Sequence, residues 1–153
     1  FHNMKITLTS ASGNVFSHDS FEKITLMTEN GQITVLPNHE PLLSVVRPGV
    51  LSLVYRENDA EKTAQYVSGG GVLTITPDDV TIVIDALDNA EQLSDADEIE
   101  KKKQEAARLI EEYKSENPTE LDPQRAMELE YEFLRYAAMQ ELVKNSSVHS
   151  GRK

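Results

Sequence analysis

The chain lacks cysteine and tryptophan, and aromatic residues are few: five tyrosines and four phenylalanines in 153 residues. Without cysteine there are no disulfide bonds, thiolate nucleophiles or thiolate metal ligands. Without tryptophan, and with tyrosine sparse in the first half, an exposed aromatic platform for sugars is disfavoured. No apolar run approaches the roughly 18 residues that a membrane span needs. These absences exclude disulfide scaffolds, thiol chemistry and direct membrane insertion.

Basic residues are also scarce. The chain has 15 Lys and Arg against 26 Asp and Glu, which gives a formal net charge of -11. An acidic surface repels the phosphates of nucleic acids, so non-specific binding to DNA or RNA is disfavoured. The same charge argues against docking on anionic lipid through a polybasic face. We therefore expect no nucleic-acid partner.

Motifs for catalysis and metal binding are missing as well. The histidines, at positions 2, 18, 39 and 149, show no metal-ligand spacing. The run Ser68-Gly69-Gly70-Gly71 lacks the lysine and the following helix of a phosphate-binding loop. We interpret it as a corner where strands approach closely. The sequence predicts a protein that is not an enzyme and that holds no cofactor or metal.

The first half of the chain has the pattern of short β-strands. From Met4 to about Leu87 the apolar residues alternate with polar ones or form β-branched runs. The run Val80–Ile84 is solid enough to predict a well-buried strand. Turn residues separate the runs, and Asn30-Gly31 is a strong hairpin signal. We predict an antiparallel β-sandwich of about ten strands over residues 4–88. Met4 is expected to be the native start, with residues 1–3 left from expression.

One loop between predicted strands has a shape set by its prolines. Pro37 and Pro41 enclose His39 and Glu40. Proline fixes its own φ and restricts the residue before it, so such a loop is extended and pre-shaped. We interpret His39 as a residue that hydrogen-bonds the backbone and fixes this turn, because only Glu40 is a titratable neighbour.

After Asp88 the apolar period changes to that of helices. Ser94 is a plausible N-cap for a charged helix over 95–116, which Asn117-Pro118 ends. Asp122 and Pro123 then have the cap-and-proline pattern of a second helix start.

The second helix is expected to run to about Lys144. The sequence thus predicts an αα-hairpin over 89–144 and a flexible tail over 145–153. The first helix has a narrow apolar stripe and buries little apolar area, so we expect the isolated hairpin to be only modestly stable unless it docks elsewhere. A weakly stable helical hairpin attached to a rigid β-sandwich is a candidate conformational switch.

Four segments in order resemble the epsilon subunit of F-type ATP synthase. They are Met4–Leu8, Leu36-Pro37-Asn38-His39-Glu40-Pro41-Leu42-Leu43, Arg47-Pro48-Gly49, and Ser68-Gly69-Gly70 with the strand that follows at 79–82. The second segment is similar to the family's Leu-Pro-Gly-His-x-Pro-Leu signature, with Asn38 in the usual glycine position. The resemblance covers nearly the whole chain.

The resemblance implies a flattened β-sandwich followed by an αα-hairpin, in a non-catalytic subunit of the central stalk. It implies that the sandwich binds the gamma subunit and the polar loops of the c-ring, and helps transmit torque. It also implies contact of the C-terminal helices with the alpha and beta subunits. The implied location is peripheral, at the cytoplasmic face of a bacterial plasma membrane. The stromal side of the chloroplast thylakoid is the alternative.

The resemblance also implies which loops face the ring. These are the turn with Asn30, Gly31 and Gln32, and the turn with His39 and Glu40. The family often has Glu where Gln32 stands, so a charge-mediated ring contact is not expected at that position.

The hairpin is implied to regulate ATP hydrolysis: folded on the sandwich it permits turnover, and extended into the catalytic head it blocks it. Some members bind ATP through an Ile/Leu-Asp-x-x-Arg-Ala motif, which here reads Ala96-Asp97-Glu98-Ile99-Glu100-Lys101. Glu91 and Asp97 are the candidate nucleotide-binding residues. Because Glu100 replaces the arginine and repels phosphates, we predict that ATP is not bound tightly.

Two alternatives come from other classes of protein. One is a free ligand-binding β-sandwich whose helical hairpin makes a dimer. The other is a stand-alone nucleotide sensor or hydrolase, which the missing phosphate-loop lysine and Glu100 disfavour.

Overall fold

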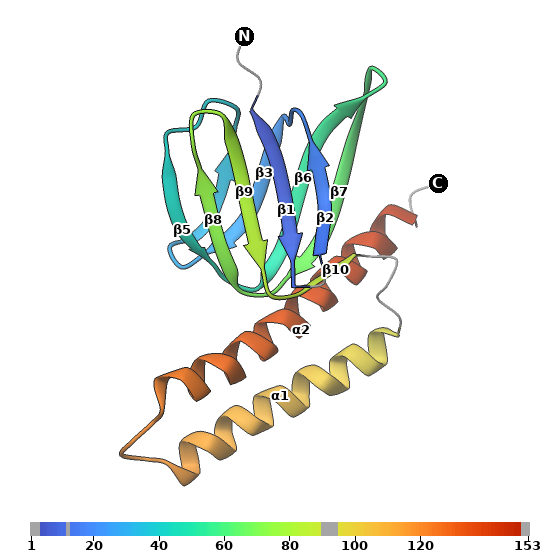
Figure 1. Ribbon diagram of the computed structural model, residues 1–153. Helices are drawn as coiled ribbons and strands as arrows, with labels where there is room; N and C mark the ends of the chain where they lie inside the picture. Colours follow the sequence, from blue (N-terminus) through green and yellow to red (C-terminus); the bar gives the residue numbers. More distant parts are fainter. Residues whose placement is uncertain (1–3, 12, 90–94, 151–153) are drawn as a thin grey trace.

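The computed structural model describes residues 4–11, 13–89 and 95–150, without the side chains of Asn14 and of residues 145–150. The described residues form a β-sandwich followed by two helices (Figure 1). The strands are β1 Lys5–Ser10, β2 Gly13–His18, β3 Lys23–Thr28, β4 Gly31–Val35, β5 Leu42–Val46, β6 Gly49–Glu57, β7 Ala60–Ser68, β8 Gly71–Ile75, β9 Asp79–Ile84 and β10 Leu87–Asn89. The predicted sandwich of about ten strands is confirmed.

The strands form one sheet that folds back on itself, in the order β10-β7-β6-β3-β5-β8-β9-β1-β2, with β4 paired to β3. Among these pairings only β1 and β9 run parallel, with Ile6 opposite Val80. The two strands are far apart in the sequence, so no tight hairpin forces them to run antiparallel. The prediction of antiparallel strands therefore holds except for this one pair.

The hydrophobic core of the sandwich is formed by the apolar residues at every second position of the strands. In β1, Ile6 and Leu8 are buried, while the residues between them face outward, because side chains alternate between the two faces of a strand. The buried cluster comprises Met4, Ile6, Leu8, Phe21, Ile24, Leu26, Val35, Val46, Leu51, Leu53, Leu73, Ile75, Val80, Ile82 and Ile84. Val83 is the exception to the solid run in β9, since its side chain is half exposed. The expectation that this whole run is buried is thus wrong at Val83.

The turns follow the predicted chemistry. The Asn30-Gly31 hairpin is confirmed: Thr28 pairs with Gly31, and Gly31 has a φ of 102°. At the tip of the β6–β7 hairpin, Asn58 and Asp59 both have positive φ, 54° and 63°. Two such residues in a two-residue loop match the twist of the flanking strands. This hairpin projects beyond the rest of the sandwich (Figure 1).

Helix α1 spans Ala96–Glu116 and helix α2 spans Pro123–Ser150. Asp95 caps α1 by accepting a hydrogen bond from the Asp97 amide at 2.9 Å. The predicted cap, Ser94, lies outside the described residues. Asp122 caps α2 by accepting from the Gln124 amide at 3.1 Å, as predicted.

Helix α2 continues past Lys144, where we expected it to end. The segment predicted to be a flexible tail is helical as far as Ser150, because no glycine or proline interrupts the sequence before Gly151. Neither helix, over the residues described, offers an apolar stretch long enough to cross a bilayer. Helix α2 lies between the sandwich and α1 (Figure 1).

The loop between β4 and β5 depends on a left-handed residue. Asn38 has a φ of 69°, and its amide donates to the Met4 sulfur at 2.8 Å. The His39 amide donates to the Leu36 carbonyl at 3.1 Å and closes the turn. Asparagine and glycine tolerate this φ far better than β-branched residues do.

We predict that Asn38→Val lowers the free energy of unfolding by about 1–2 kcal/mol, because valine is strained at positive φ. Asn38→Gly is the matched control, since glycine keeps the backbone N–H that bonds Met4 and adopts a positive φ without strain. Urea denaturation of both variants measures the difference. Equal stabilities would contradict the requirement for a left-handed residue.

Candidate functional site

The structure separates the two predicted ring-facing turns. Asn30, Gly31 and Gln32 lie where β3 turns into β4, next to the end of β5, because Thr28 pairs with Val46. His39 lies beyond the other end of β4, next to Asn38, whose amide donates to the Met4 sulfur. A five-residue strand spans about 16 Å, so the two turns lie at opposite ends of the sandwich. The expectation that both face the same way is wrong, since they flank one strand.

His39 acts on the backbone, as interpreted from the sequence. Its Nδ1 lies 2.8 Å from the Glu40 carbonyl, which can only accept, so Nδ1–H donates. Glu40 itself is exposed. This pair shapes the loop and offers no acid–base or nucleophilic arrangement.

Gln32 lies on the side of the sandwich that α2 approaches. It borders a cavity of about 190 Å³ shared with Leu134, Ala137 and Glu141 of α2. The Gln32 side chain is exposed, so it remains open to hydrogen bonding.

The candidate nucleotide-binding residues stay predictions. Asp97 is exposed in the first turn of α1, where its amide bonds the Asp95 cap. Glu91 lies outside the described residues. Glu100, which replaces the family's arginine, accepts hydrogen bonds from Gln140 of α2 and from Gln104. Its carboxylate therefore joins the two helices.

An apolar cluster attaches the hairpin to the sandwich. Val67 of β7 is fully buried against Leu142 and Ala138 of α2, and Ile99 of α1 belongs to the same cluster. The cluster therefore contains residues of all three parts of the fold.

Two ion pairs flank this cluster. Arg135 of α2 donates to Asp88 through Nη2 at 2.6 Å and Nε at 3.2 Å. Nearer the start of α2, Arg47 Nη2 lies 2.7 Å from Glu130 Oε1, and the Arg47 guanidinium lies 6.0 Å from the centre of the Tyr131 ring. Both pairs are partly exposed, so each contributes modestly to docking.

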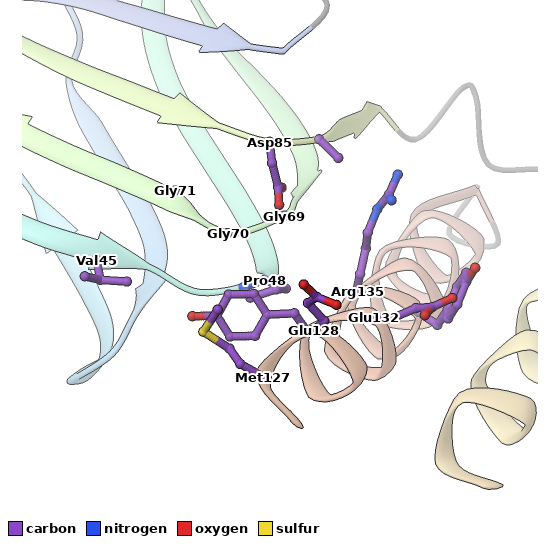
Figure 2. A pocket seen from close by; sticks show the side chains of 13 residues that line it. Val45, Pro48, Gly69, Gly70, Gly71, Asp85, Met127, Glu128, Glu132 and Arg135 are labelled. Atoms are coloured by element: carbon purple, nitrogen blue, oxygen red, sulfur yellow. The ribbon is translucent and has the colours of Figure 1, made fainter. Parts of the chain in front are cut away.

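A cavity of about 530 Å³ lies between the glycine corner and α2 (Figure 2). Gly70 and Pro48 form its sandwich side, and Met127, Tyr131 and Arg135 form its helix side. Displaced pKa values occur elsewhere: burial raises the pKa of Tyr66, and hydrogen bonds from Arg108 lower the pKa of the Glu105 carboxyl.

Within the described residues, no group of three or more His, Asp and Glu side chains is placed to hold a metal. The contacts described above are those of two surfaces that dock on each other.

One region of the outer face of the sheet, over β5, β8 and β9, is apolar and uncharged. Val45, Val72 and Val83 lie side by side on β5, β8 and β9, because Val45 pairs with Val72 and Val72 with Val83. They are 40%, 43% and 50% exposed, and Leu43 is 73% exposed. We call this row with Leu43 the valine face. Sequence reasoning missed it because Val83 sits in a run that seemed wholly buried.

Comparison with known proteins decides the family. The model for the β-sandwich domain of the ATP synthase delta/epsilon chain matches residues 3–90. The ATP synthase epsilon chain of Herminiimonas arsenicoxydans is 32% identical over 142 residues, which cover 92% of this chain and 96% of that protein. The chain belongs to the ATP synthase epsilon chain family. An epsilon chain is a non-catalytic subunit of the synthase, so the predicted function is confirmed at this level.

Two solved structures share the fold of this epsilon-family chain. A chain in the Euglena gracilis mitochondrial ATP synthase, in a structure of OSCP, F1 and c-ring, matches with a TM-score of 0.68 and 21% identity, covering 97% of this chain and 83% of that chain. A chain in the central stalk and c-ring structure of the Tetrahymena thermophila mitochondrial enzyme matches with a TM-score of 0.56 and 15% identity, covering 96% and 99%. Both matches include the hairpin as well as the sandwich.

We predict that Asp88→Asn weakens docking of the hairpin by about 0.5–1.5 kcal/mol, because Arg135 loses its charged acceptor. Amide hydrogen exchange over 134–143 should accelerate about two- to tenfold, and less so in 1 M NaCl. Glu112→Gln is the control, since it makes the same carboxylate-to-amide change on α1 while breaking only an ion pair within that helix. Equal effects of the two variants would contradict a role for Asp88 in docking.

Proposed function

We propose that this chain works in the central stalk of ATP synthase, where its sandwich binds the gamma subunit through the valine face. The observation that carries the proposal is a continuous apolar surface on a chain of net charge -11. Monomeric proteins rarely expose such patches unless a partner covers them.

The register of the sheet makes this face continuous. Next to the valine row runs a second row, in which Leu43 pairs with Thr74 and Thr74 with Thr81. On the far side, Val83 pairs with Thr9 of β1. None of these side chains carries a charge, so a partner can cover them without desolvating ions.

The two ends of the sandwich then have different partners. The His39 loop leads directly into Leu42 and Leu43, so we assign it to the gamma contact. The turn with Asn30 and Gln32 lies at the opposite end, and it exposes these two uncharged side chains together with the carboxylate of Glu29. We assign that turn to the polar loops of the c-ring, with Asn30 and Gln32 available for hydrogen bonds and Glu29 for a charged contact.

The same arrangement supports a peripheral location. A sandwich that rests on the polar loops of a membrane ring lies beside the bilayer without entering it. Because the curated relative reported above, from Herminiimonas arsenicoxydans, is bacterial, we propose the cytoplasmic face of a bacterial plasma membrane.

We predict that Val72→Lys weakens binding of the cognate gamma subunit at least a hundredfold, because it places a charge at the centre of the valine face. Thr63→Lys adds the same charge to the exposed part of β7 and is the control. Titration calorimetry with the isolated gamma subunit measures both. Unchanged affinity for Val72→Lys would exclude this face as the gamma site.

We further propose that the hairpin regulates ATP hydrolysis by leaving the sandwich and reaching the alpha and beta subunits. The structure holds the docked arrangement. The buried apolar cluster that the hairpin shares with the sandwich has five residues, against fifteen in the sandwich core. A contact of this size is reversible while the sandwich stays folded.

The release of α2 also frees opposite charges. Arg135 leaves Asp88, and Glu130 leaves Arg47. Several more acids on α2 weaken its attraction to an acidic partner surface, so electrostatics alone do not hold the extended state. The acids of α2 and its cap are Asp122, Glu128, Glu130, Glu132 and Glu141.

A reversible cross-link tests this regulation. Arg47→Cys with Glu130→Cys, joined by a bifunctional linker that forms a disulfide bond with each thiol, should hold the hairpin docked, because these side chains meet in the structure. The chain has no other cysteine to react. We predict full ATP hydrolysis by the reconstituted enzyme while the link is closed and inhibition after reduction. Arg47→Cys alone with the same linker is the control. If reduction leaves the hydrolysis rate unchanged, the hairpin does not inhibit.

A further inference from the structure

The three glycines after Ser68 have different neighbours. A Cβ added at Gly69 would lie 1.9 Å from Oδ1 of Asp85, and one at Gly71 would lie 2.0 Å from the Val83 carbonyl oxygen. Both contacts are within the sandwich, where they allow the close approach of strands predicted from the sequence. These two glycines therefore serve the β fold.

Gly70 differs because its close neighbour belongs to α2. A Cβ there would lie 2.6 Å from Cε2 and 3.0 Å from Cδ2 of the Tyr131 ring. The nearest atom of the sandwich is the Val46 carbonyl oxygen at 3.6 Å, an ordinary contact distance. Gly70 also lacks the positive φ that would itself require glycine. The lack of a side chain at Gly70 thus allows the close approach of α2 and is not needed for packing within the sheet.

Other contacts hold Tyr131 at this position. The neighbouring Glu130 pairs with Arg47, whose guanidinium also lies near the Tyr131 ring. Gly70 lies in the corner that faces α2, beside Pro48 (Figure 2). The ring therefore packs directly on the backbone at Gly70, and the Arg47 guanidinium lies near it.

We infer that Gly70 is a positioning residue for the hairpin: its missing side chain admits the Tyr131 ring and so permits α2 to dock. Overpacking a close contact by one methyl group typically shifts an equilibrium by about fivefold to a hundredfold. A single methyl at position 70 then releases the hairpin without breaking the sheet. Docking of α2 on the sandwich is a property of the isolated chain. Only the effect of Gly70 on ATP hydrolysis by the whole enzyme rests on the proposed regulation.

Two single-cysteine reporters in the cysteine-free chain separate docking from unfolding. Val67→Cys is covered by α2 in the apolar cluster, so its thiol reacts when the hairpin leaves. Leu53→Cys lies in the sandwich core and reacts only when the sandwich opens. Rates of labelling by a small thiol reagent, relative to the unfolded chain, detect even rare openings.

We predict that Gly70→Ala accelerates labelling at Val67→Cys about fivefold or more and leaves the rate at Leu53→Cys unchanged. In the background of Tyr131→Ala, Gly70→Ala should have no further effect, because the ring that it meets is gone. Gly71→Ala is the contrasting variant and should accelerate labelling at Leu53→Cys whether or not Tyr131 is present.

Three results would overturn the inference. One is no acceleration at Val67→Cys. Another is equal acceleration at Leu53→Cys, which would give Gly70 the same role as Gly71. The third is an undiminished effect in the Tyr131→Ala background. The assay contains no other subunit, so its failure leaves the cross-linking test of regulation standing, and failure of that test leaves the role of Gly70 standing.

Discussion

The position of the hairpin depends above all on one apolar cluster, in which Val67 of β7 is buried together with Leu142 of α2. Both side chains have no exposed surface, and Ile99 of α1 packs into the same cluster. Helix α1 alone has few large apolar residues with which to bury surface, and most helical stability in proteins comes from such burial. The two helices therefore form a hairpin largely because α2 has the sandwich on one side and α1 on the other.

This arrangement gives the molecule a part with a large buried core and a part attached through a small one. The sandwich has a continuous core and a sheet with few free edges, so it can present the valine face without rearrangement. The hairpin is attached by five buried residues, two partly exposed ion pairs and a ring seated on a glycine. The proposed gamma contact and the proposed release of the hairpin both depend on this difference in strength.

Much of the fold was predictable because it depends on local chemistry. Period-two patterns located the strands, Asn30-Gly31 located a hairpin, and Asp122-Pro123 located the start of α2. The end of α2 was missed, since helix ends without glycine or proline leave no clear signal. The exposure of Val83 was missed because a run of apolar residues does not reveal which face lacks a covering layer.

The sequence by itself determined the two-part architecture, the shaped His39 loop and the family to which the loop points, since each rests on residues close together in the chain. Only the tertiary structure decided that the His39 and Gln32 turns lie at opposite ends, that the valines of three strands form one face, and that Gly70 admits Tyr131. Each of these depends on strand register or on contacts between residues far apart in the chain. Such contacts follow from the packing of the whole sheet and leave no pattern within one segment.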